Sequence, residues 1–242
     1  APTDNDFGAN LHRRFVDWKN PGLKLKSFEA EEQGNRVQVV TTYELPRLAA
    51  VLTMTYLIGG NGEIRISEQL AVDKEKKDMP HLFRFGMQLV MPGRFDRIDY
   101  YGRGPVENYD DRNESQRLGR YRQLVKDQYY PYIRPQESGT KSDIRWWKQT
   151  NKGGNGLMFI SEAPFSASAL NYSIESLDDG VQKDQRHSEL VPQANYTNMC
   201  IDKVQMGLGC VNSWGALPLE QYRIHYGDYE FSFIMKPIQS NL

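Results

Sequence analysis

Hydrophobic and polar residues alternate with a period of two along much of this chain. In the first third, the alternation covers residues 23–28, 36–43, 50–58 and 63–72. Such a period places the apolar side chains on one face of a β-strand. Short stretches rich in Gly, Asn and Pro separate these segments and are typical of turns between neighbouring antiparallel strands. This part of the chain therefore predicts an antiparallel meander.

The strand pattern continues to the C-terminus. It covers residues 83–90, 97–101, 120–125, 144–149, 156–161, 165–172, 204–206, 222–226 and 229–235. Residues 10–22 and 174–188 differ, and each predicts a short helical turn or an irregular segment. Many short strands joined by turns are typical of a β-sandwich. We therefore expect a single all-β domain over residues 1–242.

Two adjacent tryptophans, Trp146 and Trp147, lie in one predicted strand. Successive side chains of a strand point to opposite faces, so one ring is expected in the core and the other on the outside. Trp18 is also expected to be structural.

The composition limits the kinds of partner. With 242 residues and 39% hydrophobic content the chain can bury a full core. Its 30 basic and 31 acidic residues are interspersed and give a net charge of −1, so neither nucleic acid nor a membrane surface is an expected partner. Cys200 and Cys210 form no metal-binding motif and are expected to be free thiols, and the scattered histidines suggest no metal site.

The sequence contains no apolar run near the roughly 20 residues of a transmembrane helix, and its polar N-terminus lacks the apolar core of a signal peptide. We expect a soluble protein. Because the sequence begins without methionine, inside a motif described below, its compartment, cytoplasmic or periplasmic, would depend on a segment upstream of Ala1.

A polar segment at residues 100–112 is the most distinctive stretch. Gly102 and Gly104 flank Arg103, Pro105 fixes the exit direction, and a polar run follows. The sequence predicts a surface loop, either a solvated hairpin connection or a loop directed at a ligand. We expect this loop to be mobile in the isolated domain, because no partners for its polar side chains are evident.

This segment, Y-G-R-G-P-V-E-N-Y-D-D-R, resembles a signature of the C-terminal domain of large bacterial β-galactosidases of glycoside hydrolase family two. Further blocks of that domain follow the same order. They are A-P-T-D-N-D-F-G at 1–8, Y-I-R-P-Q-E-S-G at 132–139, where Ser138 replaces the usual asparagine, and M-G-L-G-C-V-N-S-W at 206–214. The resemblance spans residues 1 to about 214. It implies the large antiparallel supersandwich shared with galactose mutarotases.

A glycosidase normally needs two carboxylates that flank the scissile bond. The candidates here are Glu107, Asp110, Asp111, Glu137, Asp143 and Glu162. The resemblance argues against all of them, because the catalytic glutamates of the family lie in a separate barrel domain that precedes this one. It implies that the chain is not catalytic alone and holds no cofactor. Any Mg²⁺ or Ca²⁺ and Na⁺ of the parent enzyme would be bound by other domains.

The resemblance instead implies that this domain completes the active site of the barrel. Trp214 matches a family tryptophan that stacks on the sugar, and an aromatic platform suits the C–H face of galactose. An arbitrary tryptophan is more often part of a core. The implied active-site loop contains Gly102, Arg103, Gly104, Glu107 and Asn108. The expected partners are galactosides and the preceding domains of the parent β-galactosidase.

Two alternatives remain open. An independent aldose mutarotase would use a histidine acid and a glutamate base on the sugar, and the sequence does not identify such a pair. His187 matches a family histidine, for which a structural role is preferred. A non-catalytic carbohydrate-binding module is the other alternative.

Overall fold

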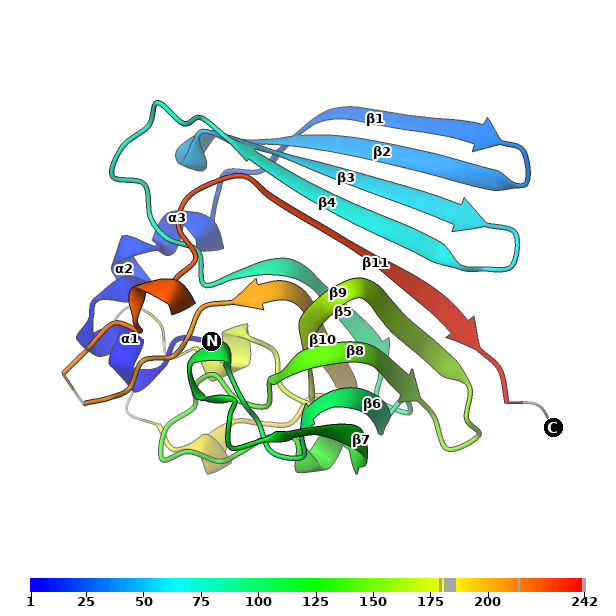
Figure 1. Cartoon of the computed structure of the whole chain (residues 1–242). Helices are drawn as coiled ribbons and strands as arrows, with labels where there is room; N and C mark the ends of the chain where they lie inside the picture. The colour runs from blue at the N-terminus through cyan, green and yellow to red at the C-terminus, as the bar shows by residue number, and fades with distance from the viewer. Residues whose placement is uncertain (179, 181–185, 213, 241–242) are drawn as a thin grey trace.

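The computed structural model describes residues 1–240 except 179, 181–185 and 213, and it consists mainly of antiparallel strands (Figure 1). The helices are short: α1 (Asp4–Gly8), α2 (Leu11–Arg14) and α3 (Val16–Lys19). The strands are β1 (Lys24–Gln33), β2 (Arg36–Leu45), β3 (Ala50–Gly59), β4 (Ile64–Val72), β5 (Arg84–Pro92), β6 (Arg97–Gly104), β7 (Arg117–Leu124), β8 (Lys141–Thr150), β9 (Gly156–Leu170), β10 (Tyr196–Gln205) and β11 (Tyr229–Ile238). Short 3₁₀ turns lie at Pro46–Leu48, Asp110–Arg112, Val125–Asp127, Glu175–Leu177, Ser188–Leu190 and Glu220–Tyr222.

The strands of the described residues form one hydrogen-bonded network in the order β1-β2-β3-β4-β11-β9-β8-β6-β7, from which β10 and β5 branch at β9. The first half of β9 pairs with β11 and β8, and its second half pairs with β10 and, less regularly, with β8. Figure 1 shows β1–β4 fanning out on one side and β6–β10 on the other, with β11 running between them. This arrangement confirms the all-β sandwich and the antiparallel meander of the first four strands.

Three strand predictions need correction. Segments 156–161 and 165–172 belong to one strand, β9, because Pro164 lies between Ile160 and Phe165, where the pairing with β8 is irregular and needs no regular ladder hydrogen bond. Strand β10 begins at Tyr196, well before the predicted 204–206. Residues 197–202 are buried on both faces between β5 and β9, so no alternation marks them.

The prediction of a strand at 222–226 is wrong. Ile224 forms only an isolated bridge with Leu82. The Arg223 side chain donates to Pro218 O at 2.8 Å and to Glu220 Oε2 at 2.6 Å, which holds the segment in a compact turn.

The tryptophan pair lies as predicted. Trp147 is completely buried and stacks on Tyr100, with 5.1 Å between ring centroids and 20° between ring planes. The strand register causes this contact, because Tyr100 of β6 lies opposite Trp147 of β8. Trp146 lies on the other face, beneath the side-chain cations of Arg120 and Lys148. Trp18 is structural as well: it packs against the core and donates from Nε1 to Pro80 O at 3.0 Å.

The glycines of the central segment lie in a strand, not in the predicted loop. Gly102 and Gly104 pair with Gly119 and Arg117 as part of β6. A Cβ on Gly102 would lie 2.4 Å from Ile144 Cδ1, and one on Gly104 would lie 2.1 Å from the Tyr100 hydroxyl. Glycine is therefore required here for close packing, and its backbone is fixed by the sheet.

The two tryptophans provide a direct test of this core. We expect Trp147→Ala to lower the free energy of unfolding by roughly 3–5 kcal/mol, because it empties a fully buried site. The neighbouring control, Trp146→Ala, is expected to cost about 1 kcal/mol or less, since it removes a partly exposed ring and its cation–π contacts. Urea unfolding of both variants measures the difference. Equal losses would contradict the assignment of faces.

Candidate functional site

The Glu107 carboxylate joins two of the sequence blocks, the central segment at residues 100–112 and the block at residues 132–139. Its Oε2 accepts hydrogen bonds from the Gly139 amide at 2.7 Å and from Ser138 Oγ at 3.2 Å, and its Oε1 accepts one from the Tyr132 hydroxyl. Arg112 Nη2 lies 3.4 Å from the same Oε1. Burial and the neighbouring Glu107 raise the pKa of Tyr132 to about 12, so the phenol stays protonated and donates. Residues 132–139 are thus tied directly to the segment after β6.

Asn108 is fully buried and uses both ends of its amide. Its Nδ2 donates to the carbonyls of Arg103 (3.2 Å) and Val106 (3.0 Å). Its Oδ1 accepts from the backbone N (3.0 Å) and the Oγ (2.6 Å) of Ser142. The side chain therefore fastens the segment to the start of β8.

Arg103 is also engaged inside the domain. Its Nε lies 2.5 Å from Asp143 Oδ2, and its Nη1 donates to Gln116 O at 3.1 Å. The expectation that these polar side chains lack partners in the isolated domain is therefore wrong, whereas the mobility of the segment stays a prediction. Arg103, Glu107 and Asn108 find their partners on segments that are distant in sequence, which the sequence alone does not reveal. Their positions toward a substrate stay a prediction.

Trp214 is one of the most exposed large side chains of the described residues, with 87% of its surface accessible. The prediction of a loop position, outside the core, is confirmed, whereas contact with a sugar remains a prediction. The backbone nitrogens of Trp214 (2.9 Å) and Ala216 (3.4 Å) donate to Asn212 Oδ1, which folds the chain into a tight turn. Ser213 of the same motif lies outside the described residues. We call residues 207–212 and 214–216 the Trp214 loop.

Two residues that hold this loop were not singled out in the sequence for this role. Asn5 contacts the loop from α1, and Asp111 contacts it from the central motif. In the sequence, the only signal for either residue was its position inside a motif block, residues 1–8 for Asn5 and residues 100–112 for Asp111.

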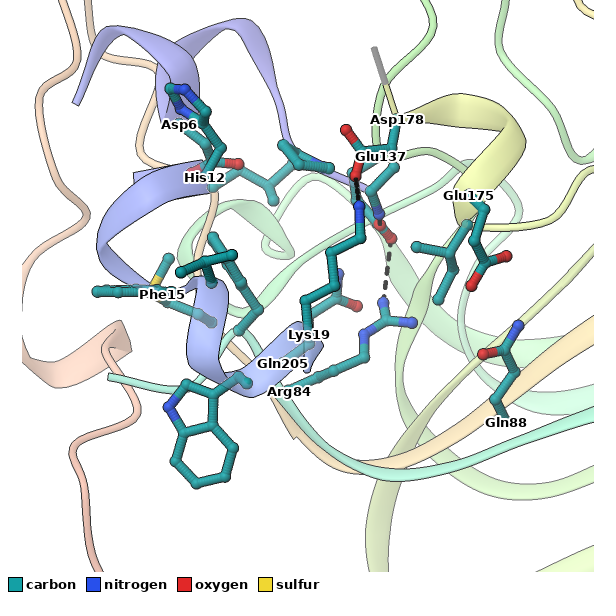
Figure 2. A pocket seen from close by; sticks show the side chains of 18 of the residues that line it. Asp6, His12, Phe15, Lys19, Arg84, Gln88, Glu137, Glu175, Asp178 and Gln205 are labelled. Atoms are coloured by element: carbon teal, nitrogen blue, oxygen red, sulfur yellow. Dashed lines mark hydrogen bonds and ion pairs between the residues drawn. The ribbon is translucent and has the colours of Figure 1, made fainter. Parts of the chain in front are cut away.

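A separate cavity of about 420 Å³ lies between the short helices and the strands, and Figure 2 shows its side chains. Lys19 Nζ reaches Asp178 Oδ2 at 2.6 Å, and Arg84 Nη2 reaches Glu137 Oε1 at 3.2 Å (Figure 2). Burial opposes ionisation of Glu137, but in the isolated chain the α-amino group of Ala1, followed by Arg84, outweighs it and lowers the pKa to about 2. A carboxylate with that pKa is a weak base near neutral pH, so in the isolated chain Glu137 is poorly suited to remove a proton from a sugar.

Two further carboxyls, of Asp202 and Glu68, are buried in the described part of the chain. Burial and the neighbouring carboxylate of Glu137 raise the pKa of Asp202 to about 6, against the attraction of Arg84 Nη1 at 3.8 Å. Burial, followed by the charge of Asp202, raises the pKa of Glu68 to about 8. Glu68 Oε1 is buried without a hydrogen-bond partner. Glu68 is therefore accommodated best in its neutral form.

Within the described ranges, no group of three or more His, Cys, Asp or Glu side chains is arranged to hold a metal ion. Cys200 and Cys210 are free thiols, as predicted. None of the described helices has the length and apolar character needed to cross a membrane.

The neutral Glu68 predicts a pH-dependent effect of Glu68→Gln. Its folded pKa of about 8 exceeds the unfolded value of 4.5, so its contribution to stability is complete below pH 4.5 and is lost as the pH rises to about 8. As the pH rises from 4.5 to about 8, the free energy of unfolding of Glu68→Gln should increase relative to that of wild type by on the order of 2–5 kcal/mol. Urea titrations across the range measure this gain.

Glu162→Gln is the control, because Glu162 has an exposed side chain. It should leave the free energy of unfolding nearly unchanged, because an exposed side chain makes few contacts. If the difference between Glu68→Gln and wild type did not change with pH, Glu68 would be ionised normally in the folded protein.

Comparison with known proteins agrees with the sequence blocks. A family model described as "Beta galactosidase small chain" matches residues 1–235. The curated β-galactosidase of Priestia megaterium is 32% identical over 98% of this chain, which covers 22% of that protein. The β-galactosidase of Lactobacillus delbrueckii subsp. bulgaricus is 36% identical over 89% of this chain and 21% of its own length.

Similarity to solved structures is more distant. The α-galactosidase from Lactobacillus brevis aligns with 90% of this chain and 27% of its own, at 9% identity and a TM-score of 0.47. The sequence matches are decisive, since the family model extends over nearly the whole chain. The chain spans about a fifth of the length of the curated relatives it matches, and it belongs to the β-galactosidase small-chain family.

Proposed function

We propose that this chain completes the active site of a β-galactosidase, to which it contributes Trp214 as an aromatic platform for the terminal galactose. The other parts of that enzyme would carry the catalytic carboxylates and any metal ions. The exposure of Trp214 is the observation that carries this proposal. A large ring with 87% of its surface accessible, on a hydrogen-bonded turn, offers its apolar face to the C–H side of a sugar.

The carboxylates of the chain support a non-catalytic role. Glu107 is occupied by four donors, Asp143 pairs with Arg103, and Glu137 pairs with Arg84. Each of these carboxylates therefore has a structural partner. This favours a domain that binds and orients the substrate over one that cleaves it.

The segment after β6, which contains Glu107, would support this site indirectly. Its hydrogen bonds hold the chain between β6 and β8 in one conformation. A fixed segment of this kind can present Arg103 and its neighbours to an adjoining domain without a large loss of entropy on binding. Its proposed role is rigid support of the Trp214 site.

Trp214→Ala tests the platform in the complete enzyme. A platform stabilises substrate and transition state alike, so KM should rise while kcat changes little. Burial of an aromatic face is worth roughly 2–3 kcal/mol, which corresponds to about 30- to 150-fold in binding. The thermal midpoint should hardly change, because the ring is exposed.

Trp146→Ala provides the matched control, since it removes an aromatic ring from the outer face of β8. Its KM should equal that of wild type. An unchanged KM in Trp214→Ala would refute the platform.

The isolated chain should neither hydrolyse a chromogenic β-galactoside nor accelerate the mutarotation of α-galactose. The first expectation follows from the structural pairing of its carboxylates, and the second from the low pKa of Glu137 in the cavity. Absorbance and optical rotation measure the two rates against buffer. Turnover lost on Glu137→Gln would establish an independent enzyme.

A further inference from the structure

We infer that Asp111 and Asn5 are positioning residues that anchor the Trp214 loop from two sides. The inference deepens the proposed function and rests on it for the effect on substrate. The anchoring itself can be measured without a substrate.

Asp111 fixes the first arm of the loop. Its Oδ2 accepts the Gly209 amide at 2.7 Å. A Cβ on Gly207 would lie 2.7 Å from Asp111 Cγ, so the backbone passes directly against the carboxylate. A hydrogen bond from an amide to a charged acceptor is stronger than one between neutral groups. Asp111 therefore determines where the loop leaves the domain.

Asn5 joins the two arms. Its side chain is buried, and its Nδ2 donates to Leu208 O at 3.3 Å and to Ala216 O at 2.8 Å. These carbonyls lie on opposite sides of Trp214 in the sequence. One side-chain amide thus holds the two ends of the loop together.

The glycines of the loop show how tightly this base is packed. Gly209 has a φ of +66°, and a Cβ there would lie 2.6 Å from Ala216 O. Gly215 has a φ of +81°, and a Cβ there would lie 2.3 Å from the Ala9 amide nitrogen. The backbone of both arms therefore touches its surroundings, which leaves little freedom at the base.

The two anchors come from different motif blocks. Asn5 belongs to the opening block, whose helix α1 is fixed by a capping box between Thr3 and Asp6. Asp111 follows Asn108, which is bonded on all sides. Both anchors are thus held by rigid parts of the fold, as a group that positions another residue must be.

The experiment follows the indole Nε1–H signal of Trp214 by ¹⁵N NMR in the isolated chain, assigned by its loss in Trp214→Ala. The heteronuclear NOE reports motion on the picosecond to nanosecond scale. We expect Asp111→Ala and Asn5→Ala to lower this NOE. Asp111→Asn should restore it, because the amide oxygen can still accept the Gly209 N–H. Asp99→Ala is the control, because it removes a carboxylate of β6 that pairs with Arg120 and Arg122 of β7 and not with the Trp214 loop.

The same variants are then compared in the complete enzyme. KM should rise about tenfold or more in Asp111→Ala and Asn5→Ala, with kcat nearly unchanged and with recovery in Asp111→Asn. An unchanged NOE in both alanine variants would overturn the anchoring. A lower NOE with an unchanged KM would confirm the anchoring and refute the platform role of Trp214. If the alanine variants failed to fold, loss of NOE in folded Asp111→Asn would overturn the role assigned to its acceptor oxygen.

Discussion

The candidate site depends on the hydrogen bonds of one partly buried carboxylate. Glu107 gathers a backbone amide and two hydroxyls from residues 132–139, and the loss of these donors would leave a largely desolvated carboxylate without partners, which is destabilising. Its bonds determine the path of the chain after β6. That path in turn places Asn108 against β8 and Asp111 against the Trp214 loop. A single requirement for hydrogen-bond partners therefore connects segments that are up to about a hundred residues apart.

The molecule separates two physical roles. Apolar burial, exemplified by Trp147 against Tyr100, holds the strands together and tolerates little change in volume. Hydrogen bonds to side-chain carboxylates and amides shape the ends of the strands, where the backbone leaves the sheet. The buried carboxyls of Asp202 and Glu68 belong to neither role, because the charge of Asp202 is only partly compensated and Glu68 is held neutral. These two groups make stability depend on pH without contributing to the Trp214 loop.

Sequence patterns predicted the strands whose faces differ in environment. The opposite faces of Trp146 and Trp147 followed from the period of two, and the first four strands followed from alternation and turns. Strand β10 was largely missed because both its faces are buried. The partners of Glu107 and Asn108 could not be predicted, since they depend on which distant segments meet. The glycines of β6 were misleading for a related reason: a glycine that is needed for close packing looks, in sequence, like one that is needed for flexibility.

The central claim is that the hydrogen bonds of Glu107, Asn108 and Asp111 hold one exposed ring, Trp214, where it can contact a galactoside. That galactoside would be bound mainly by other parts of a β-galactosidase. A crystal structure of the complete enzyme with galactose bound tests it most directly. The account predicts that the Trp214 ring lies face-on to the C–H side of the sugar, with carbon–carbon distances of about 4 Å, while Asp111 and Asn5 keep their bonds to the loop. A bound galactose that Trp214 does not touch, with the ring buried against another protein segment, would contradict it.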